Sequence, residues 1–155
     1  MKPITWQPSA TGDIVVPETI ASWFGGPNDP DDNGETAGGV DNSKPGVMGC
    51  ALPMTLSNGK IVNGCFGSPL PNLPWRIMVQ VWRADIPPTS VGRAITIPLI
   101  DVGPDLIEDR GIDLTPSAFL ALGGDLKTGL LKVGYRIVEG AKYLHLTSIN
   151  QGGAK

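Results

Sequence analysis

The sequence predicts a mainly β domain with long loops and one short helix. Glycine provides 21 and proline 15 of the 155 residues, and both residue types interrupt regular elements and favour turns. The hydrophobic share of 41% is too high for a disordered chain. Because a chain of this length fits one domain with one core, we expect a single, loop-rich β domain.

Strands are predicted where apolar and polar residues alternate, or where β-prone residues lie between turns. In the run 91–100, Ile95, Ile97 and Leu99 share one face, and the run ends just before Asp101. Asp101 is therefore expected at the C-terminal mouth of a strand. The predicted strands are residues 20–24, 75–82, 91–100, 130–138 and 143–149.

A short helix is predicted after Thr115. Thr115 is a good N-cap, Pro116 suits the first helical position, and Gly123 follows the apolar run 117–122. Glycine after the last helical residue is a common stop signal. The helix is the one regular element that local signals define at both ends.

The chain divides into an N-terminal arm over residues 1–19, a folded domain over 20–150 and a flexible tail over 151–155. The arm is polar and punctuated by proline, with at most a short strand at 14–16. Residues 25–74 are rich in Gly, Pro, Asn and Asp, and an irregular stretch of this length inside a compact domain usually carries function.

Several short motifs follow one another along the chain, and their order carries a resemblance. Residues 100–104 read Ile-Asp-Val-Gly-Pro, 111–115 read Gly-Ile-Asp-Leu-Thr, and 121–123 read Ala-Leu-Gly. Upstream, 21–25 read Ala-Ser-Trp-Phe-Gly and 36–39 read Thr-Ala-Gly-Gly. This order resembles the double-psi β-barrel of the rare lipoprotein A family, which is related to the barrels of expansins and family 45 endoglucanases.

The resemblance implies a six-stranded double-psi β-barrel with a surface groove for polysaccharide. In some members of that family the barrel is a lytic transglycosylase that acts on peptidoglycan glycan strands. The residues expected to shape the groove are Trp23, Phe24, Gly25, Thr36 and Gly103. Large aromatics such as Trp23 and Phe24 are alternatively core or barrel-end side chains.

Two positions depart from the family pattern. Val40 stands where active members carry Glu, and Gly49 stands where they carry His, so that Asp101 alone remains of the three polar residues. Lytic cleavage needs a carboxylic acid that protonates the glycosidic oxygen and then accepts a proton from the sugar. Asp101 is the candidate for both steps, and its alternative role is that of a turn aspartate that accepts backbone N–H bonds.

Asp113 is the second candidate catalytic residue. It corresponds to an Asp that expansins and related endoglucanases carry at this place, and it pairs with Asp101 in a hydrolase if the two carboxyls are suitably spaced. Its alternative role is to support the helix start. The loop carboxylates Asp29, Asp32, Glu35 and Asp41 are further candidates to replace the missing Glu.

A calcium loop is a weaker alternative for residues 29–34. Asp29, Asp31 and Asn33 match the opening of such a loop, but its twelfth position is Val40 and it contains a proline. A solvated turn fits the same residues. No metal or other cofactor is therefore expected.

Charge and hydropathy limit the classes of binding partner. A net charge of −3 with scattered basic residues argues against nucleic acid, and no apolar run is long enough to span a bilayer. No signal peptide is recognisable at the start. A phage or prophage component, or a secreted domain trimmed of its signal, is consistent with a barrel acting at the cell wall.

Two function classes remain open from the sequence. The first is a peptidoglycan-directed enzyme with Asp101 as acid and base. The second, suggested by Val40 and Gly49, is a non-catalytic carbohydrate-binding or structural virion barrel. Cys50 and Cys65 are spaced so that a disulfide and two reduced thiols are equally consistent with the sequence.

Overall fold

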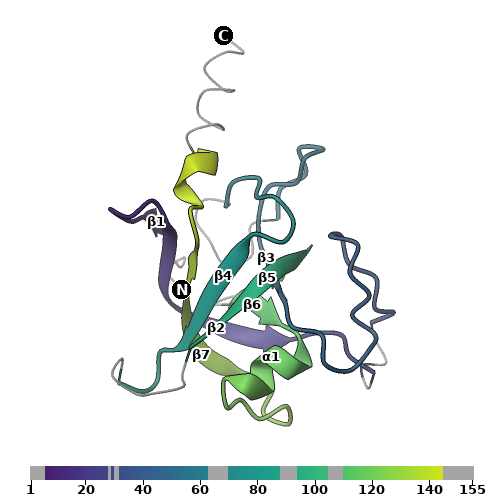
Figure 1. The fold of residues 1–155 in the computed structure, drawn as a ribbon. Coiled ribbons are helices and arrows are strands. Elements are labelled where there is room, and N and C mark those ends of the chain that lie inside the picture. The colour runs from purple at the N-terminus through teal and green to yellow at the C-terminus, as the bar shows by residue number, and fades with distance from the viewer. Residues whose placement is uncertain are drawn as a thin grey trace.

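A computed structural model describes residues 6–27, 29, 32–62, 70–87, 94–104 and 110–144 (Figure 1). The described part of the chain is mainly β. Its elements are β1 (Gln7–Pro8), β2 (Ile14–Trp23), β3 (Cys50–Leu52), β4 (Met78–Arg83), β5 (Ala94–Val102), β6 (Arg110–Leu114), α1 (Pro116–Ala121) and β7 (Leu131–Ile137).

Six strands close into a barrel. The order is β2-β6-β3-β5-β4-β7, and β7 pairs back with β2, so the ring has no free edge. The pairs β2–β6 and β3–β5 are parallel, and the other four are antiparallel. Exchanging β2, β3 and β4 for β5, β6 and β7 leaves this pattern unchanged. This internal symmetry is that of the double-psi barrel, and the predicted fold class is confirmed.

Alternating side chains from every barrel strand fill the core. The inward residues of β7 are Val133, Tyr135 and Ile137, all fully buried. The Tyr135 hydroxyl donates to the Gly111 carbonyl at 2.8 Å, which satisfies a polar atom that burial would otherwise penalise. Each fully buried Val, Leu or Ile contributes about 1.5–3 kcal/mol to folding, and the core is the main source of stability.

The helix α1 covers part of the barrel, as its cap residues predict. The Thr115 side chain accepts from the Ala118 N–H, and Pro116 stands in the first turn. Ala118 and Phe119 are buried. The expectation of one helix was incomplete, because residues 141–144 form a second short helix where a last strand was predicted to begin. The remainder of that predicted strand, from residue 145 on, lies outside the described residues.

The barrel begins at Ile14, earlier than the predicted boundary at residue 20. Ile14 and Val16 are buried and pair with Ile137 and Tyr135 of β7. The prediction of an arm over residues 1–19 was wrong for this part because Pro17, which lacks an N–H, obscured the strand. The register shift between Val16 and Thr19 accommodates it.

The long irregular stretch contains a strand that local patterning did not reveal. Cys50–Leu52 forms β3, which is fully buried and lies between β5 and β6. Three residues are too few for a periodic signal, and their neighbours in the barrel define them. Cys50 is a free, fully buried thiol whose pKa is raised by burial, and Cys65 lies outside the described residues.

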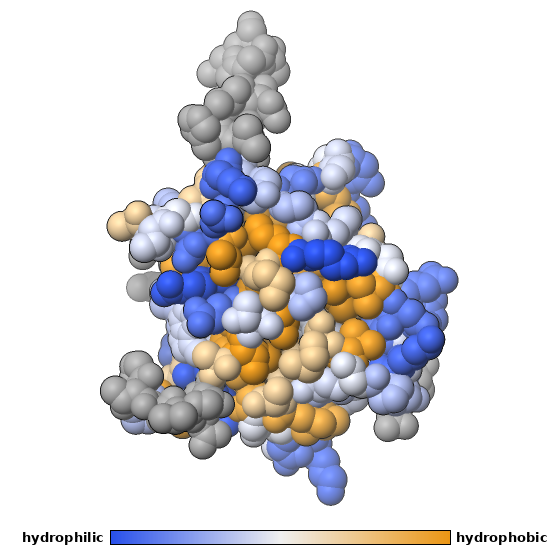
Figure 2. All heavy atoms as spheres, viewed as in Figure 1, coloured by the Kyte–Doolittle hydropathy of each residue, from blue (hydrophilic) through white to orange (hydrophobic). Residues whose placement is uncertain are grey.

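The outer surface is mixed in polarity. Figure 2 shows apolar residues gathered near the middle of the face viewed in Figure 1. Met78 at the start of β4 and Val138 after β7 are among the exposed apolar side chains. Within the described residues, no helix is long and apolar enough to cross a membrane.

Candidate functional site

Asp101 and Asp113 lie at one level of the barrel wall. Ala51 of β3 pairs with Asp101 of β5 on one side and with Asp113 of β6 on the other. Ser22 of β2 continues the row, because it pairs with Asp113. Neighbouring strands lie about 4.8 Å apart, so the Cα atoms of the two aspartates are roughly 10 Å apart. The barrel thus brings together both predicted carboxylates.

A β-bulge in β5 turns Asp101 away from the core. Ile97 and Leu99 point inward, and simple alternation would send Asp101 inward as well. The register changes from Cys50↔Leu99 to Ala51↔Asp101, so that β5 contains one extra residue, Ile100. An extra residue reverses the faces that follow it, and Asp101 joins the outward row of Asp113.

The Asp101 carboxylate is partly buried and asymmetrically held. Its Oδ1 accepts from the Ala37 N–H at 3.0 Å and from the Val102 N–H at 2.9 Å. Within the described part of the chain, no hydrogen bond engages its Oδ2. Burial raises the pKa of Asp101, the two backbone hydrogen bonds oppose this, and the nearby negative charge of Asp32 adds to it. Among the described loop carboxylates, Asp32 is the one whose charge acts on Asp101.

Asp113 is held by a side chain rather than by backbone. The Ser22 hydroxyl donates a short hydrogen bond to its Oδ1. Burial raises the pKa of Asp113, Ser22 and the positive charge of Arg110 lower it, and the charge of Asp101 raises it. Asp113 lies within β6 and Thr115 is the N-cap, so the predicted support of the helix start belongs to Thr115.

The loop that reaches Asp101 is docked on β5. The Gly38 N–H donates to the Ile100 carbonyl at 2.9 Å, and Arg76 Nη1 donates to the Gly38 carbonyl at 2.8 Å. The bulge supplies this carbonyl, because Ile100 has no partner residue on β3. Sequence reasoning missed Arg76 because it assigned this residue to the alternating strand predicted over 75–82, whereas β4 begins at Met78.

The predicted groove residues Trp23, Phe24 and Gly103 make contacts that hold the barrel together. Trp23 packs against the core and its Nε1–H donates to the Leu126 carbonyl at 3.1 Å, as expected of a barrel-end side chain. The Phe24 N–H donates to the Leu114 carbonyl. Gly103 directly follows β5, which ends at Val102. Its N–H donates to the Leu52 carbonyl of β3.

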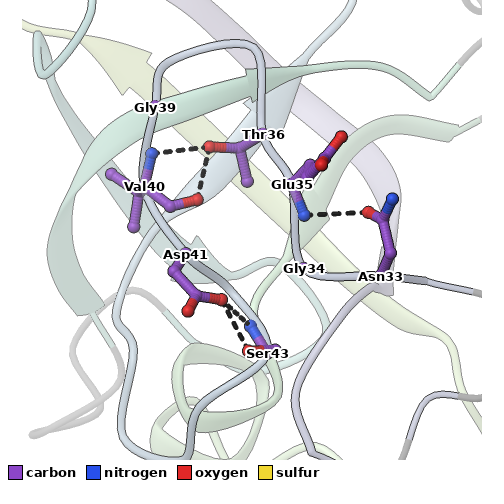
Figure 3. Close-up of a pocket in the computed structure, with 8 residues that line it drawn as sticks. All are labelled: Asn33, Gly34, Glu35, Thr36, Gly39, Val40, Asp41 and Ser43. Atoms are coloured by element: carbon purple, nitrogen blue, oxygen red, sulfur yellow. Dashed lines mark hydrogen bonds between the residues drawn. The ribbon is translucent and has the colours of Figure 1, made fainter.

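Gly25 and Thr36 shape the loops. The Gly25 N–H donates to Asp29 Oδ2 at 2.9 Å, and its φ of 75° favours glycine. The Thr36 hydroxyl donates to the Val40 carbonyl and accepts from the Val40 N–H (Figure 3). Val40 therefore closes a tight turn, and its side chain supplies no carboxylate.

A side chain at position 49 would crowd Ile100. A Cβ atom there would lie 2.8 Å from Ile100 Cδ1, and Ile100 is buried. The same bulge residue that turns Asp101 outward thus occupies the space that a histidine at position 49 would need.

A pocket of about 430 Å³ lies within the long loop, and residues of the Thr36–Val40 turn line part of it (Figure 3). The Asp41 carboxylate accepts two hydrogen bonds from Ser43, which lower the pKa of Asp41. The residues that line the pocket are Asn33, Gly34, Glu35, Thr36, Gly39, Val40, Asp41 and Ser43.

The residues of the weaker calcium alternative are used by turns. Asp29 Oδ2 accepts from the Gly25 N–H, and Asn33 Oδ1 accepts from the Glu35 N–H. Asp31 lies outside the described residues. Among those that the structure describes, no group of three or more His, Cys, Asp or Glu side chains is arranged to hold a metal ion.

Comparison with known proteins gives a structural likeness and no family. No family model matches the chain, and no curated protein matches its sequence. The structure is similar to that of the Streptomyces papain inhibitor (SPI), with a TM-score of 0.46 and 23% identity over 76% of this chain and 89% of the other. The function of the chain therefore has to be inferred from the side chains of the barrel itself.

Proposed function

We propose that this barrel binds and cleaves a polysaccharide, with Asp101 as the acid and base. The observation that carries the proposal is the position of two partly buried carboxyls, Asp101 and Asp113, on either side of Ala51. Burial raises the pKa of both. A carboxyl with a raised pKa keeps its proton closer to neutral pH, as a general acid requires.

The hydrogen bonds of Asp101 suit that role. Two backbone N–H groups fix Oδ1 and leave Oδ2 to meet a glycosidic oxygen. In lytic cleavage Asp101 would protonate this oxygen as its bond to the sugar C1 breaks. Asp101 would then take the proton of the sugar's own hydroxyl as that hydroxyl oxygen bonds to C1. In hydrolysis Asp113 would activate a water molecule, and inverting enzymes separate their carboxyls by about 6.5–9.5 Å.

The substrate class follows from the resemblance of the motifs around Asp101 to those of rare lipoprotein A. On that basis the substrate is peptidoglycan glycan strands, and the barrel acts at the cell wall, reached by secretion or as a phage product. No cofactor enters the proposed chemistry.

The experiment is the incubation of the full chain with purified peptidoglycan and the identification of released fragments. Release of anhydro-muropeptides indicates lytic cleavage, and release of reducing ends indicates hydrolysis. Asp101→Asn should reduce release at least 100-fold. Asp125→Asn, the same change in the loop before β7, is the matched control. Unchanged release by Asp101→Asn would contradict the catalytic role.

A second candidate is a barrel that binds carbohydrate without cleaving it. Val40 in a closed turn and Gly49 under Ile100 favour it, because neither position supplies a polar group. In that case the chain sediments with insoluble peptidoglycan while releasing nothing, and Asp101→Asn leaves the bound fraction unchanged.

A further inference from the structure

Arg76 joins the long loop to the barrel beside Asp101. Its backbone N–H donates to the Leu99 carbonyl at 2.8 Å, and its Nη1 donates to the Gly38 carbonyl at 2.8 Å. The φ of Arg76 is 72°, a left-handed conformation that is unfavourable for residues with a side chain. Such outliers persist where the surrounding structure holds them, and they cluster at functional sites.

Gly38 fills the space between Arg76 and β5. A Cβ atom on Gly38 would lie 2.5 Å from the Ile100 carbonyl oxygen and 3.1 Å from Arg76 Nη1. The Gly38 N–H donates to that same Ile100 carbonyl. The peptide groups of Gly38 are thus held from two sides, by β5 and by the guanidinium.

Ala37 transmits this constraint to the carboxylate. Ala37 directly precedes Gly38, and its N–H donates to Asp101 Oδ1 at 3.0 Å. Ala37 itself is exposed, so packing does not hold it in place. Arg76 Nη1 donates to the Gly38 carbonyl, and the neighbouring Ala37 N–H donates to Asp101. These contacts therefore connect Arg76 to Asp101 through the loop.

We propose that Arg76 is a positioning residue for Asp101: it anchors Gly38 on the β5 bulge, and the anchored loop holds the Ala37 N–H on the Asp101 carboxylate. This hydrogen bond fixes Oδ1 and leaves Oδ2 directed at the ligand. The consequence for cleavage rests on the proposed function, but the effect on Asp101 does not.

Nuclear magnetic resonance tests this effect without any substrate. An amide proton that is bonded to a carboxylate shifts downfield as that carboxylate ionises. In the wild-type chain the Ala37 amide proton should follow the titration of Asp101. In Arg76→Gly the amplitude of this shift should fall at least twofold, and the amides of the Thr36–Val40 turn should exchange roughly tenfold faster, as for the loss of one hydrogen bond.

The choice of glycine separates positioning from unfolding. Glycine adopts a φ of 72° without the steric penalty that a side chain carries. This relief offsets the lost hydrogen bond, so Arg76→Gly should unfold close to the wild-type temperature. Arg76→Lys, which retains a donating, positively charged group, should restore part of the Ala37 shift. Lys132→Ala, which removes a positive charge from β7, is the control and should leave the Ala37 shift unchanged.

The outcomes are distinct. If the Ala37 proton follows Asp101 equally well in Arg76→Gly, the positioning role is overturned, whatever the chain does to glycans. If the shift is lost, the role stands, and a lower kcat with little change in KM on peptidoglycan extends it to cleavage. A wild-type chain that releases nothing overturns the proposed function alone, because the amide titration needs no substrate.

Discussion

Asp101 of β5 and Asp113 of β6 face the same side of the barrel wall because both pair with Ala51 of β3. The negative charge of Asp101 raises the pKa of Asp113. Four expected outcomes follow from this pair and from the packing that holds it in place.

The first prediction concerns stability against pH. Burial raises the pKa of Asp101 above its ordinary value of 3.8, so the folded state holds the proton more tightly than the unfolded chain. This group therefore lowers the free energy of unfolding as pH rises from about 3.8 through the raised folded pKa. Asp101→Asn removes the effect, and its stability relative to wild type should increase with pH over that window.

Urea denaturation at several pH values measures this difference, with Asp125→Asn as the control. An amide at position 101 can still accept the Ala37 and Val102 N–H groups, so the backbone hydrogen bonds are matched. A stability difference that is flat or falls as pH rises would show that burial does not disfavour the Asp101 anion.

The second prediction concerns Ser22. Its hydroxyl donates to Asp113 and lowers the pKa of that carboxyl. Ser22→Ala removes the donor, and the pKa of Asp113 should rise further. Ser22→Thr keeps a hydroxyl and is the matched variant. Carboxyl ¹³C shifts of Asp113 followed against pH measure both, and an unchanged midpoint in Ser22→Ala would contradict the assigned hydrogen bond.

The third prediction concerns the contact between Gly49 and Ile100. Gly49→Ala places a Cβ 2.8 Å from Ile100 Cδ1, and overpacking of this kind costs about 1–3 kcal/mol. Ile100→Val removes that methyl group. The double variant should therefore be more stable than the sum of the single changes predicts, as measured by urea denaturation. Simple additivity would mean that the two side chains do not compete for the same space.

The fourth prediction concerns Thr115, which is fully buried. Its Oγ1 accepts from the Ala118 N–H that caps α1 and from the Gly49 N–H at 3.2 Å. Thr115→Ala loses a cap and leaves a buried donor without a partner, for a cost of about 2–4 kcal/mol. Thr115→Ser, which keeps the hydroxyl, should lose roughly half as much or less. Equal losses in both would show that the methyl group matters rather than the hydrogen bonds.

Local patterns in the sequence predict those parts of the fold whose signals lie within a few residues. The cap at Thr115 and Pro116 defines the start of α1, and alternation defines the β7 region. The same rules failed at Pro17, where a proline obscured the continuation of β2, and at Cys50–Leu52, where three residues are too short for a period. Strand pairing over long separations decides such segments.

The sequence by itself predicted a mainly β domain, and the resemblance of its motifs implied a double-psi barrel with Asp101 and Asp113 as candidate site residues. The tertiary structure alone decided that the two carboxyls share a face, because the extra residue Ile100 reverses the alternation of β5. It also decided that Arg76 reaches the loop that holds Asp101. The bulge depends on strand pairing, and the contact of Arg76 spans 38 residues. Local residue patterns do not predict such long-range contacts.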